Sequence, residues 1–112
     1  MTTTTFTQPQ INFDELRASA DVACGLLRAM ANTDRLMLLC QLSLGEKSVG
    51  ELETLLGIHQ PTLSQQLTVL REANLVATRR EGKSIIYRIS SQAAMAVMQV
   101  LHQQICTTYT NA

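Results

Sequence analysis

The stretch that decides the fold is QPTLSQQLTVLRE, residues 60–72. At about 100° per residue, Leu63, Leu67 and Leu70 fall on one narrow stripe, which predicts the buried face of an amphipathic helix. Pro61 suits the first position of that helix, because its missing N–H would have no partner there. The stretch therefore predicts a helix with one apolar face.

The opposite face of this helix is polar without being charged. It carries Ser64, Gln65 and Thr68, and its first charges are Arg71 and Glu72 at the end of the stretch. A solvated helix face usually carries Lys and Glu, whereas hydroxyls and amides indicate a face that hydrogen-bonds to something. The edges of DNA bases are one candidate.

The residues before this helix add a second helix and a turn. Ser48 and Glu51 form a capping box, and Gly57 ends the helix that the box begins. Residues 58–60 make a short turn before Pro61. This pattern is typical of a helix-turn-helix whose second helix enters the major groove. A plain helical hairpin within a bundle is the alternative.

Charge is unevenly distributed along the chain. The 112 residues suffice for one domain, and the formal net charge of zero by itself argues against a nucleic-acid binder. Residues 58–90, however, hold five basic residues against two acidic ones, a local charge of +3, and residues 91–112 hold no Lys, Arg, Asp or Glu. A basic segment around the predicted recognition helix is the asymmetry expected of a DNA-binding domain.

Residues 1–10 show no secretory signal, and no apolar run reaches the length of a membrane span. We therefore expect a cytoplasmic protein without membrane contact, whose thiols are kept reduced. Its three cysteines, Cys24, Cys40 and Cys106, then form no structural disulfide framework. The lack of a CxxC pair indicates neither a thioredoxin-type centre nor a zinc knuckle.

Residues 1–11 are polar and Thr-rich, which predicts a disordered arm, and residues 12–108 are expected to form one DNA-binding and dimerisation domain. Its first helix should run from about residue 12 to 30, with Cys24 as a buried, inert thiol at the edge of an apolar stripe. A second helix over residues 35–43 is apolar nearly all round and so should be buried, with Cys40 pointing inward.

Two β-favouring runs follow the recognition helix. Within residues 75–89 they flank a basic turn containing Gly82, which predicts a hairpin. A hairpin directly after a helix-turn-helix is a wing, and Arg79, Arg80 and Lys83 near its tip suit phosphate contacts or the adjacent minor groove. A solvated hairpin edge blunted by charge is the alternative.

A last helix over about residues 91–106 is free of charged residues and rich in apolar ones. We expect it to pack, together with the first helix, against a second copy of the chain. The predicted fold class is mainly α with a β-hairpin wing, a winged helix-turn-helix of order α-α-α-α-β-β-α in a homodimer.

This order of elements resembles the ArsR/SmtB family of winged-helix repressors over roughly residues 13–106. The segment PTLSQQL at 61–67, with VLRE at 69–72, resembles that family's recognition helix, and LV at 75–76 and RREGK at 79–83 continue the likeness. The resemblance implies a homodimeric repressor, with no enzymatic activity and no cofactor. Such a repressor binds palindromic, double-stranded operator DNA and releases it when an inducer binds.

The residues expected to contact DNA lie on the recognition helix and the wing. They are Gln60, Thr62, Ser64, Gln65, Gln66, Thr68, Arg71, Arg79, Arg80, Lys83, Ser84 and Tyr87.

Most members of the family sense metal ions, and two departures weaken that expectation here. Residues 48–52 lack the Cys-x-Cys pair of the arsenic and cadmium type. The last helix offers only His102 to the ligand set of the zinc and nickel type, and it has no acidic residue.

The segments MLLC at 37–40 and IC at 105–106, with GELE at 50–53 and the recognition helix, resemble the BigR/SqrR-type subgroup of the family. That resemblance implies sensing of sulfide-derived persulfides of low molecular weight through Cys40 and Cys106. A disulfide or polysulfide bridge joins the two thiols and operator DNA is released. Spacing alone does not bring these cysteines together. His102, one turn before Cys106, either helps to form its thiolate or serves only packing.

Three other classes of function stay open. Zinc held by Cys40, His102 and Cys106 would keep the DNA function but replace the sensor chemistry with a metal. A cysteine-based oxidoreductase is disfavoured, because neither a CxxC pair nor a cofactor loop is visible. A winged helix used for protein–protein contact is compatible with the zero net charge.

Overall fold

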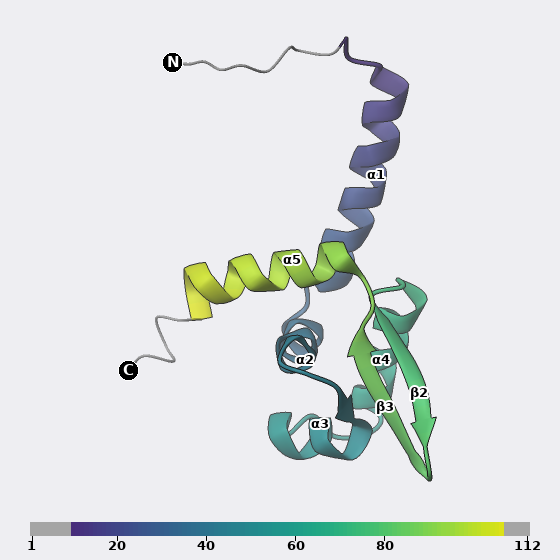
Figure 1. The fold of residues 1–112 in the computed structure, drawn as a ribbon, viewed down its shortest axis with the longest axis vertical. Coiled ribbons are helices and arrows are strands. Elements are labelled where there is room, and N and C mark those ends of the chain that lie inside the picture. Colours follow the sequence, from purple (N-terminus) through teal and green to yellow (C-terminus); the bar gives the residue numbers. More distant parts are fainter. Residues whose placement is uncertain (1–9, 107–112) are drawn as a thin grey trace.

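The computed structural model describes residues 10–106, and side chains as far as residue 105 (Figure 1). The arm predicted over 1–11 lies outside the described residues except for its last two, and so do the last two residues of the domain predicted over 12–108. The elements are, in order, α1 (Phe13–Met30), α2 (Thr33–Ser43), β1 (Lys47–Ser48), α3 (Val49–Leu56), α4 (Thr62–Glu72), β2 (Val76–Glu81), β3 (Ser84–Ile89), α5 (Gln92–Leu101) and the π-helical turn η1 (His102–Cys106).

Side-chain caps set the starts of the helices. The Asn12 carboxamide oxygen accepts hydrogen bonds from the backbone N–H groups of Asp14 and Glu15 at the start of α1. Both halves of the predicted capping box between Ser48 and Glu51 are present. These caps satisfy N–H groups that the first turn of a helix leaves unpaired. Most predicted helix starts are confirmed within one or two residues, although Pro61 lies at the N-cap position of α4, where it makes no side-chain hydrogen bond, rather than in the first turn.

The wing belongs to a three-stranded antiparallel sheet of order β1-β3-β2. The predicted hairpin is confirmed, with Gly82 in the left-handed region at φ 62° in the turn. The sequence did not predict β1, in which Lys47 pairs with Tyr87 and Ser48 with Ile86 of β3. A strand of two residues is too short to show the alternation by which strands are recognised.

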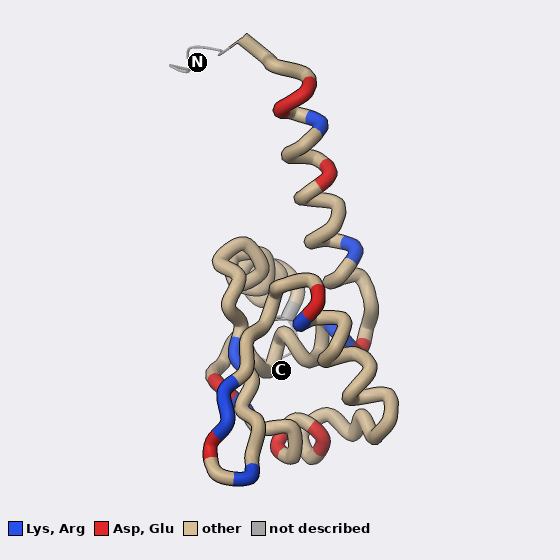
Figure 2. Tube along the Cα trace, turned by 90° about the vertical axis from the view of Figure 1, so that its right-hand side faces the viewer, with Lys and Arg blue, Asp and Glu red and all other residues tan. Residues whose placement is uncertain are grey.

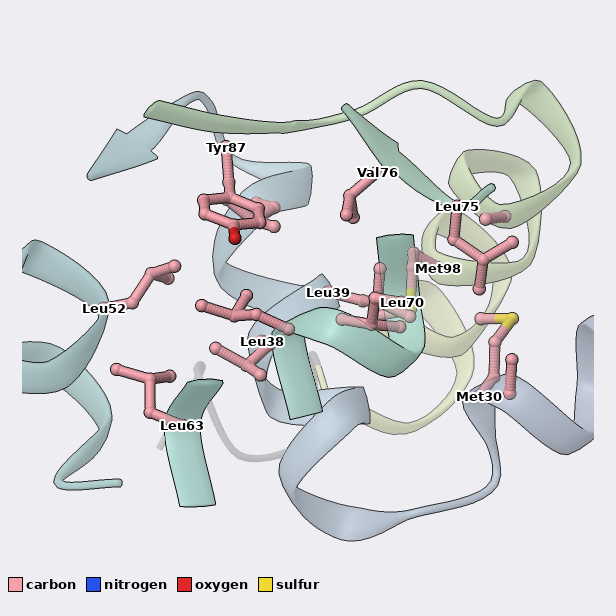
Figure 3. Close-up of a cluster of buried hydrophobic side chains, with 14 of the residues drawn as sticks. Met30, Leu38, Leu39, Leu52, Leu63, Leu70, Leu75, Val76, Tyr87 and Met98 are labelled. Atoms are coloured by element: carbon pink, nitrogen blue, oxygen red, sulfur yellow. The ribbon is translucent and has the colours of Figure 1, made fainter. Parts of the chain in front are cut away.

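The core is built mainly from leucines of α2, α3 and α4 around the inner face of the sheet (Figure 3). Fully buried are Leu38 and Leu39 of α2, Leu52 of α3, and Leu63 and Leu70 of α4. Close packing of these side chains holds α4 against α2 and β2, because each element contributes apolar atoms to one continuous cluster.

The first helix extends away from this body (Figure 1). Only its last two residues, Ala29 and Met30, are buried, and Val22 is 75% exposed. The prediction that Cys24 is buried is wrong for the single chain, in which this side chain is exposed. The middle of α1 reaches beyond the core, so nothing in the described part of the chain covers it.

The second helix is less completely buried than its composition indicated. Leu38, Leu39 and Leu42 are buried, but Met37 lies at the surface and Leu44, which follows the helix, is 68% exposed. Although α2 contacts α1, α3, α4, α5 and β3, a domain of this size is too small to cover every side of it. Among the residues described, no helix is both long and apolar enough to cross a membrane.

Replacing Leu70 with Ala should lower the free energy of unfolding by about 2–5 kcal/mol, because the side chain is fully buried and its loss leaves a cavity. Val69→Ala is the matched control on the same helix, since Val69 is 37% exposed. Urea unfolding at one protein concentration compares the two variants. Equal losses for the two variants would contradict this description of the core.

Candidate nucleic-acid interface

The leucine stripe determines which face of α4 points outward. Leu63, Leu67 and Leu70 are buried, as the sequence predicted. On the same helix Ser64, Gln65 and Thr68 are exposed. Burial of this stripe fixes the rotation of α4 about its own axis, so the polar face points to solvent.

Two of these exposed side chains form hydrogen bonds to nearby residues, one to Gln60 before the helix and one within it. The Ser64 hydroxyl donates to Oε1 of Gln60 at 2.5 Å, and that same oxygen accepts from the Ser64 backbone N–H at 3.0 Å. The Thr68 hydroxyl donates to the carbonyl of Ser64 at 2.8 Å. Ser64 and Thr68 therefore offer mainly their oxygen lone pairs to a ligand.

Gln65 is the most available hydrogen-bonding group on this face. Within residues 10–106 its side chain makes no hydrogen bond that the structure records, and it is exposed. A glutamine amide carries a donor and an acceptor side by side, which matches the N6 and N7 edge of adenine. Gln65 is thus chemically suited to read a base.

Gln66, also predicted to contact DNA, is turned partly inward. It is half-buried, and its Oε1 accepts a hydrogen bond of 2.8 Å from a terminal guanidinium nitrogen of Arg35 on α2. Thr62 is likewise half-buried, at the first turn of α4. These two side chains are less available to a ligand than Ser64, Gln65 and Thr68.

Strand alternation separates the basic residues of the wing. Along β2, Val76 and Arg80 lie on the face that carries the buried ring of Tyr87, whereas Arg79 and Glu81 lie on the other face. The cations predicted to act together at the tip therefore point to opposite sides of the sheet.

Arg79 is held by two carboxylates on the outer face. One of its terminal nitrogens lies 2.8 Å from Glu46, in the loop after α2, and the other is ion-paired with Glu81. Hydrogen bonds to Glu46 and Glu81 raise the pKa of the Arg79 guanidinium, and the same contact holds the pKa of the Glu46 carboxyl below its ordinary value. Much of the charge of Arg79 is therefore neutralised locally.

The remaining cations near the interface are exposed. Arg71 ends the outward side of α4, and Arg80, Lys83 and Ser84 lie at or near the tip of the wing. No ion pair within the described part of the chain involves Arg71, Arg80 or Lys83. Figure 2 shows the basic positions gathered along the hairpin, interrupted by one acidic position close to its turn.

The prediction that Tyr87 contacts DNA is wrong. Its ring is 7% exposed and points into the core among Leu38, Leu52 and Val76 (Figure 3). Tyr87 pairs with Thr78 on the inner face of the hairpin and with Lys47 of β1. The side chain is buried because Tyr87 lies on the face of β3 that α2 and α3 cover.

The cysteines lie away from the polar face of α4. Cys40 is half-buried on α2 and packs against the core, and α2 in turn packs against α5. Cys106 ends η1, which continues α5, and its side chain lies outside the described residues. His102 is half-buried at the start of η1. Among the described residues, no group of three His, Cys, Asp or Glu side chains is arranged to hold a metal ion.

The sequence did not indicate Arg35 and Glu46, whose side chains hold two of the predicted residues. Arg35 and its partner Gln66 are 31 positions apart, and Glu46 and Arg79 are 33 apart. No local spacing rule relates residues at such separations. The available signal was that Arg35 is the one basic residue of α2, a helix rich in apolar residues.

Comparison with known proteins gives consistent results for this architecture. A family model described as the bacterial regulatory protein, arsR family, matches residues 32–78. The chain is 45% identical over 101 residues to the biofilm growth-associated repressor of Xylella fastidiosa (strain Temecula1 / ATCC 700964), covering 90% of this chain and 89% of the relative.

Two solved structures have the same fold. Reduced HlyU from Vibrio cholerae N16961 matches with a TM-score of 0.80 and 42% identity, covering 82% of this chain and 97% of that one. The homodimeric winged helix-turn-helix DNA-binding domain of a possible ArsR-family regulator from Mycobacterium bovis matches with a TM-score of 0.73 and 27% identity, covering 94% and 96%. The repressor from Xylella fastidiosa is 45% identical and is matched over about nine-tenths of its length. The chain therefore belongs to the ArsR family of bacterial transcriptional regulators.

Proposed function

We propose that this protein is a homodimeric repressor that binds palindromic operator DNA and releases it when persulfides oxidise Cys40 and Cys106. The observation that carries the DNA-binding part is the outward face of α4, where Ser64, Gln65 and Thr68 are exposed beside a basic wing. A relative that is 45% identical is named as a repressor, which supports repression as the activity. In this proposal the protein acts on operator DNA in the cytoplasm.

In this proposal α4 enters the major groove and the wing follows the phosphate backbone. Gln65 reads a base edge, and Ser64 and Thr68 accept hydrogen bonds. Arg71, Arg80, Lys83 and Ser84 contact phosphates and set the register, and Gln60 and Thr62 support the start of the helix.

The wing can be tested through the salt dependence of DNA binding. Arg80→Ala should weaken binding to all duplexes about equally and lower the slope of log K against log salt by about 0.9, because one phosphate contact is lost. Arg79→Ala, the matched control, should lower the slope less, because Glu46 and Glu81 already hold this cation. Fluorescence anisotropy at salt concentrations from about 50 to 200 mM measures the slope for each variant. An affinity that does not vary with salt would contradict the proposed interface.

The dimer is proposed to form through α1 and α5. Apolar side chains of α1 remain exposed in the single chain, Leu16, Val22 and Leu27 among them, and Val100 of α5 is exposed as well. Beside α1 an open, largely apolar hollow of about 830 Å³ is lined by Val22, Leu26, Ala73, Leu75 and Ala93, among others. Apolar surface of this extent favours association with a second copy.

Leu16→Glu should convert the dimer to a monomer, because it places a charge in the proposed interface at a side chain that is 53% exposed in the single chain. Arg17→Glu changes the neighbouring side chain of the same helix and should stay dimeric. Analytical ultracentrifugation at micromolar concentration distinguishes the two. A monomeric wild type would overturn this part of the proposal.

The proposed switch is a two-step thiol chemistry. One cysteine thiolate attacks the outer sulfur of a low-molecular-weight persulfide, taking that sulfur and releasing the small thiol. The second thiolate then attacks the cysteine sulfur of the protein persulfide, forming the disulfide and releasing sulfide. Two protein thiols are oxidised, and the transferred sulfur is reduced.

Packing of α2 against α5 supports this pairing, because Cys40 lies on α2 and Cys106 ends the turn that continues α5. A bridge that closes so long a loop restrains the chain by about 4 kcal/mol in the entropic model. About 1–3 kcal/mol of coupling suffices to change DNA affinity. That entropy is removed from the unfolded chain, so we attribute the shift of the paired recognition helices to the arrangement of α2 and η1 that the bridge requires.

Cys40→Ser and Cys106→Ser should each bind DNA as the reduced wild type does and should stay bound after persulfide treatment. Cys24→Ser, the control, should still be released, although the Cys24 thiol, unlike that of Cys40, is exposed in the single chain. Gel shift with mass spectrometry of the treated protein gives both the release and the product. If Cys24→Ser loses the response while Cys40→Ser keeps it, the pair is misassigned.

A further inference from the structure

Arg35 joins three parts of the structure. Its Nε donates to the carbonyl of Ala29 at 2.6 Å, and one terminal nitrogen donates to the carbonyl of Arg28 at 3.3 Å, both at the end of α1. Its other terminal nitrogen donates to Oε1 of Gln66 on α4 at 2.8 Å. The guanidinium of α2 therefore bridges the last turn of α1 and the recognition helix.

The chemistry of each contact suits an arginine. The last carbonyls of a helix have no partner within the helix and carry a partial negative charge, so they attract a cation. The planar guanidinium donates in several fixed directions at once, which a lysine ammonium on its flexible stem does not reproduce. Asn32 holds the backbone of Arg35 as well, since its side chain accepts from the Arg35 N–H at 3.0 Å.

This bridge constrains the helix that carries the polar face. Gln66 follows Gln65 directly, so a hydrogen bond that fixes one side of α4 at Gln66 also limits how far Gln65 can rotate or shift. The same guanidinium fixes the end of α1, the helix proposed to form the dimer. One side chain thus links α4, already held by the core, to the helix through which the dimer is proposed to form.

We propose that Arg35 is a positioning residue for DNA recognition, acting through Gln66, and that Gln66 itself contacts no base. The inference rests on the proposed DNA-binding function. It assigns Gln65 and Gln66, two adjacent residues of the same type, to different tasks. Gln65 reads the operator and Gln66 links the recognition helix to α1 and α2.

A double-mutant cycle tests the inference on the full-length reduced protein. The probe is a duplex selected by the wild type from a random-sequence pool, with an unrelated duplex of the same length alongside. Arg35→Ala and Gln66→Ala should each weaken binding to the selected duplex roughly 2- to 30-fold, the range seen for residues that act through others. The double variant should be no weaker than the weaker single one, because both changes break the same link.

Binding to the unrelated duplex and the salt slope separate positioning from direct contact. Both should be unchanged in Arg35→Ala, because no phosphate contact is removed. A salt slope lowered by about 0.9 would mean that Arg35 itself touches phosphate, and the inference would be wrong.

A charge substitution gives a second test that does not depend on removing Arg35. Gln66→Glu should be tolerated, because a carboxylate at this position forms an ion pair with Arg35. Gln65→Glu, the matched control, should lose affinity for the selected duplex by at least the factor found for Arg35→Ala. Equal losses for the two Glu variants would show that Gln66 faces the DNA and would overturn the inference.

These outcomes also distinguish the inference from the proposal on which it rests. If the wild type selects no duplex from the pool, the proposed function fails and the inference fails with it. If the wild type selects a duplex but Arg35→Ala binds it equally well, only the inference fails. Additive losses in the cycle would likewise contradict the inference alone.

Discussion

The burial of one stripe of leucines on α4 is the constraint on which the rest of the interface depends. Burying a leucine side chain is worth about 1.5–3 kcal/mol, and Leu63, Leu67 and Leu70 are all buried. A turn of the helix by one residue position, about 100°, would expose these side chains and bury polar ones. The polar face therefore has no freedom to turn away from solvent. The side of α4 that the core does not cover carries amides and hydroxyls, and these groups are therefore presented to solvent.

The sheet imposes a similar constraint on the wing. Side chains alternate between the two faces of a strand, so Arg79 and Arg80, adjacent in sequence, point in opposite directions. Arg79 lies with Glu46 and Glu81 on the outer face, while Arg80 lies on the face that continues the packed side. The number of cations in a hairpin is thus a poor measure of how many are available to phosphate.

The second helix links the two parts of the proposed mechanism. It carries Arg35 near its start and Cys40 near its end, and it packs against α4 and α5. A helix of 11 residues moves largely as one body, so a restraint applied at Cys40 also acts on the bridge from Arg35 to Gln66. The proposed dimer would use the apolar face of α1, because the single chain leaves this surface uncovered.

Local signals in the sequence determined the helices, their caps and the outward face of α4. The capping box at Ser48, the stop at Gly57 and the leucine stripe are short-range features, and physical rules relate residues a few positions apart. Likewise, the likeness of residues 60–72 to a recognition helix needed no tertiary information. Family and fold class could therefore be predicted from the sequence.

Tertiary structure alone decided which of the predicted residues are available. Tyr87 lies in the core because α2 and α3 pack on the face of β3 that carries its side chain. Gln66 and Arg79 acquired partners 31 and 33 positions away, and Cys24 is exposed because α1 extends beyond the core. Each outcome depends on segments brought together from distant parts of the chain, and the periodicity of one segment carries no information about its distant partners.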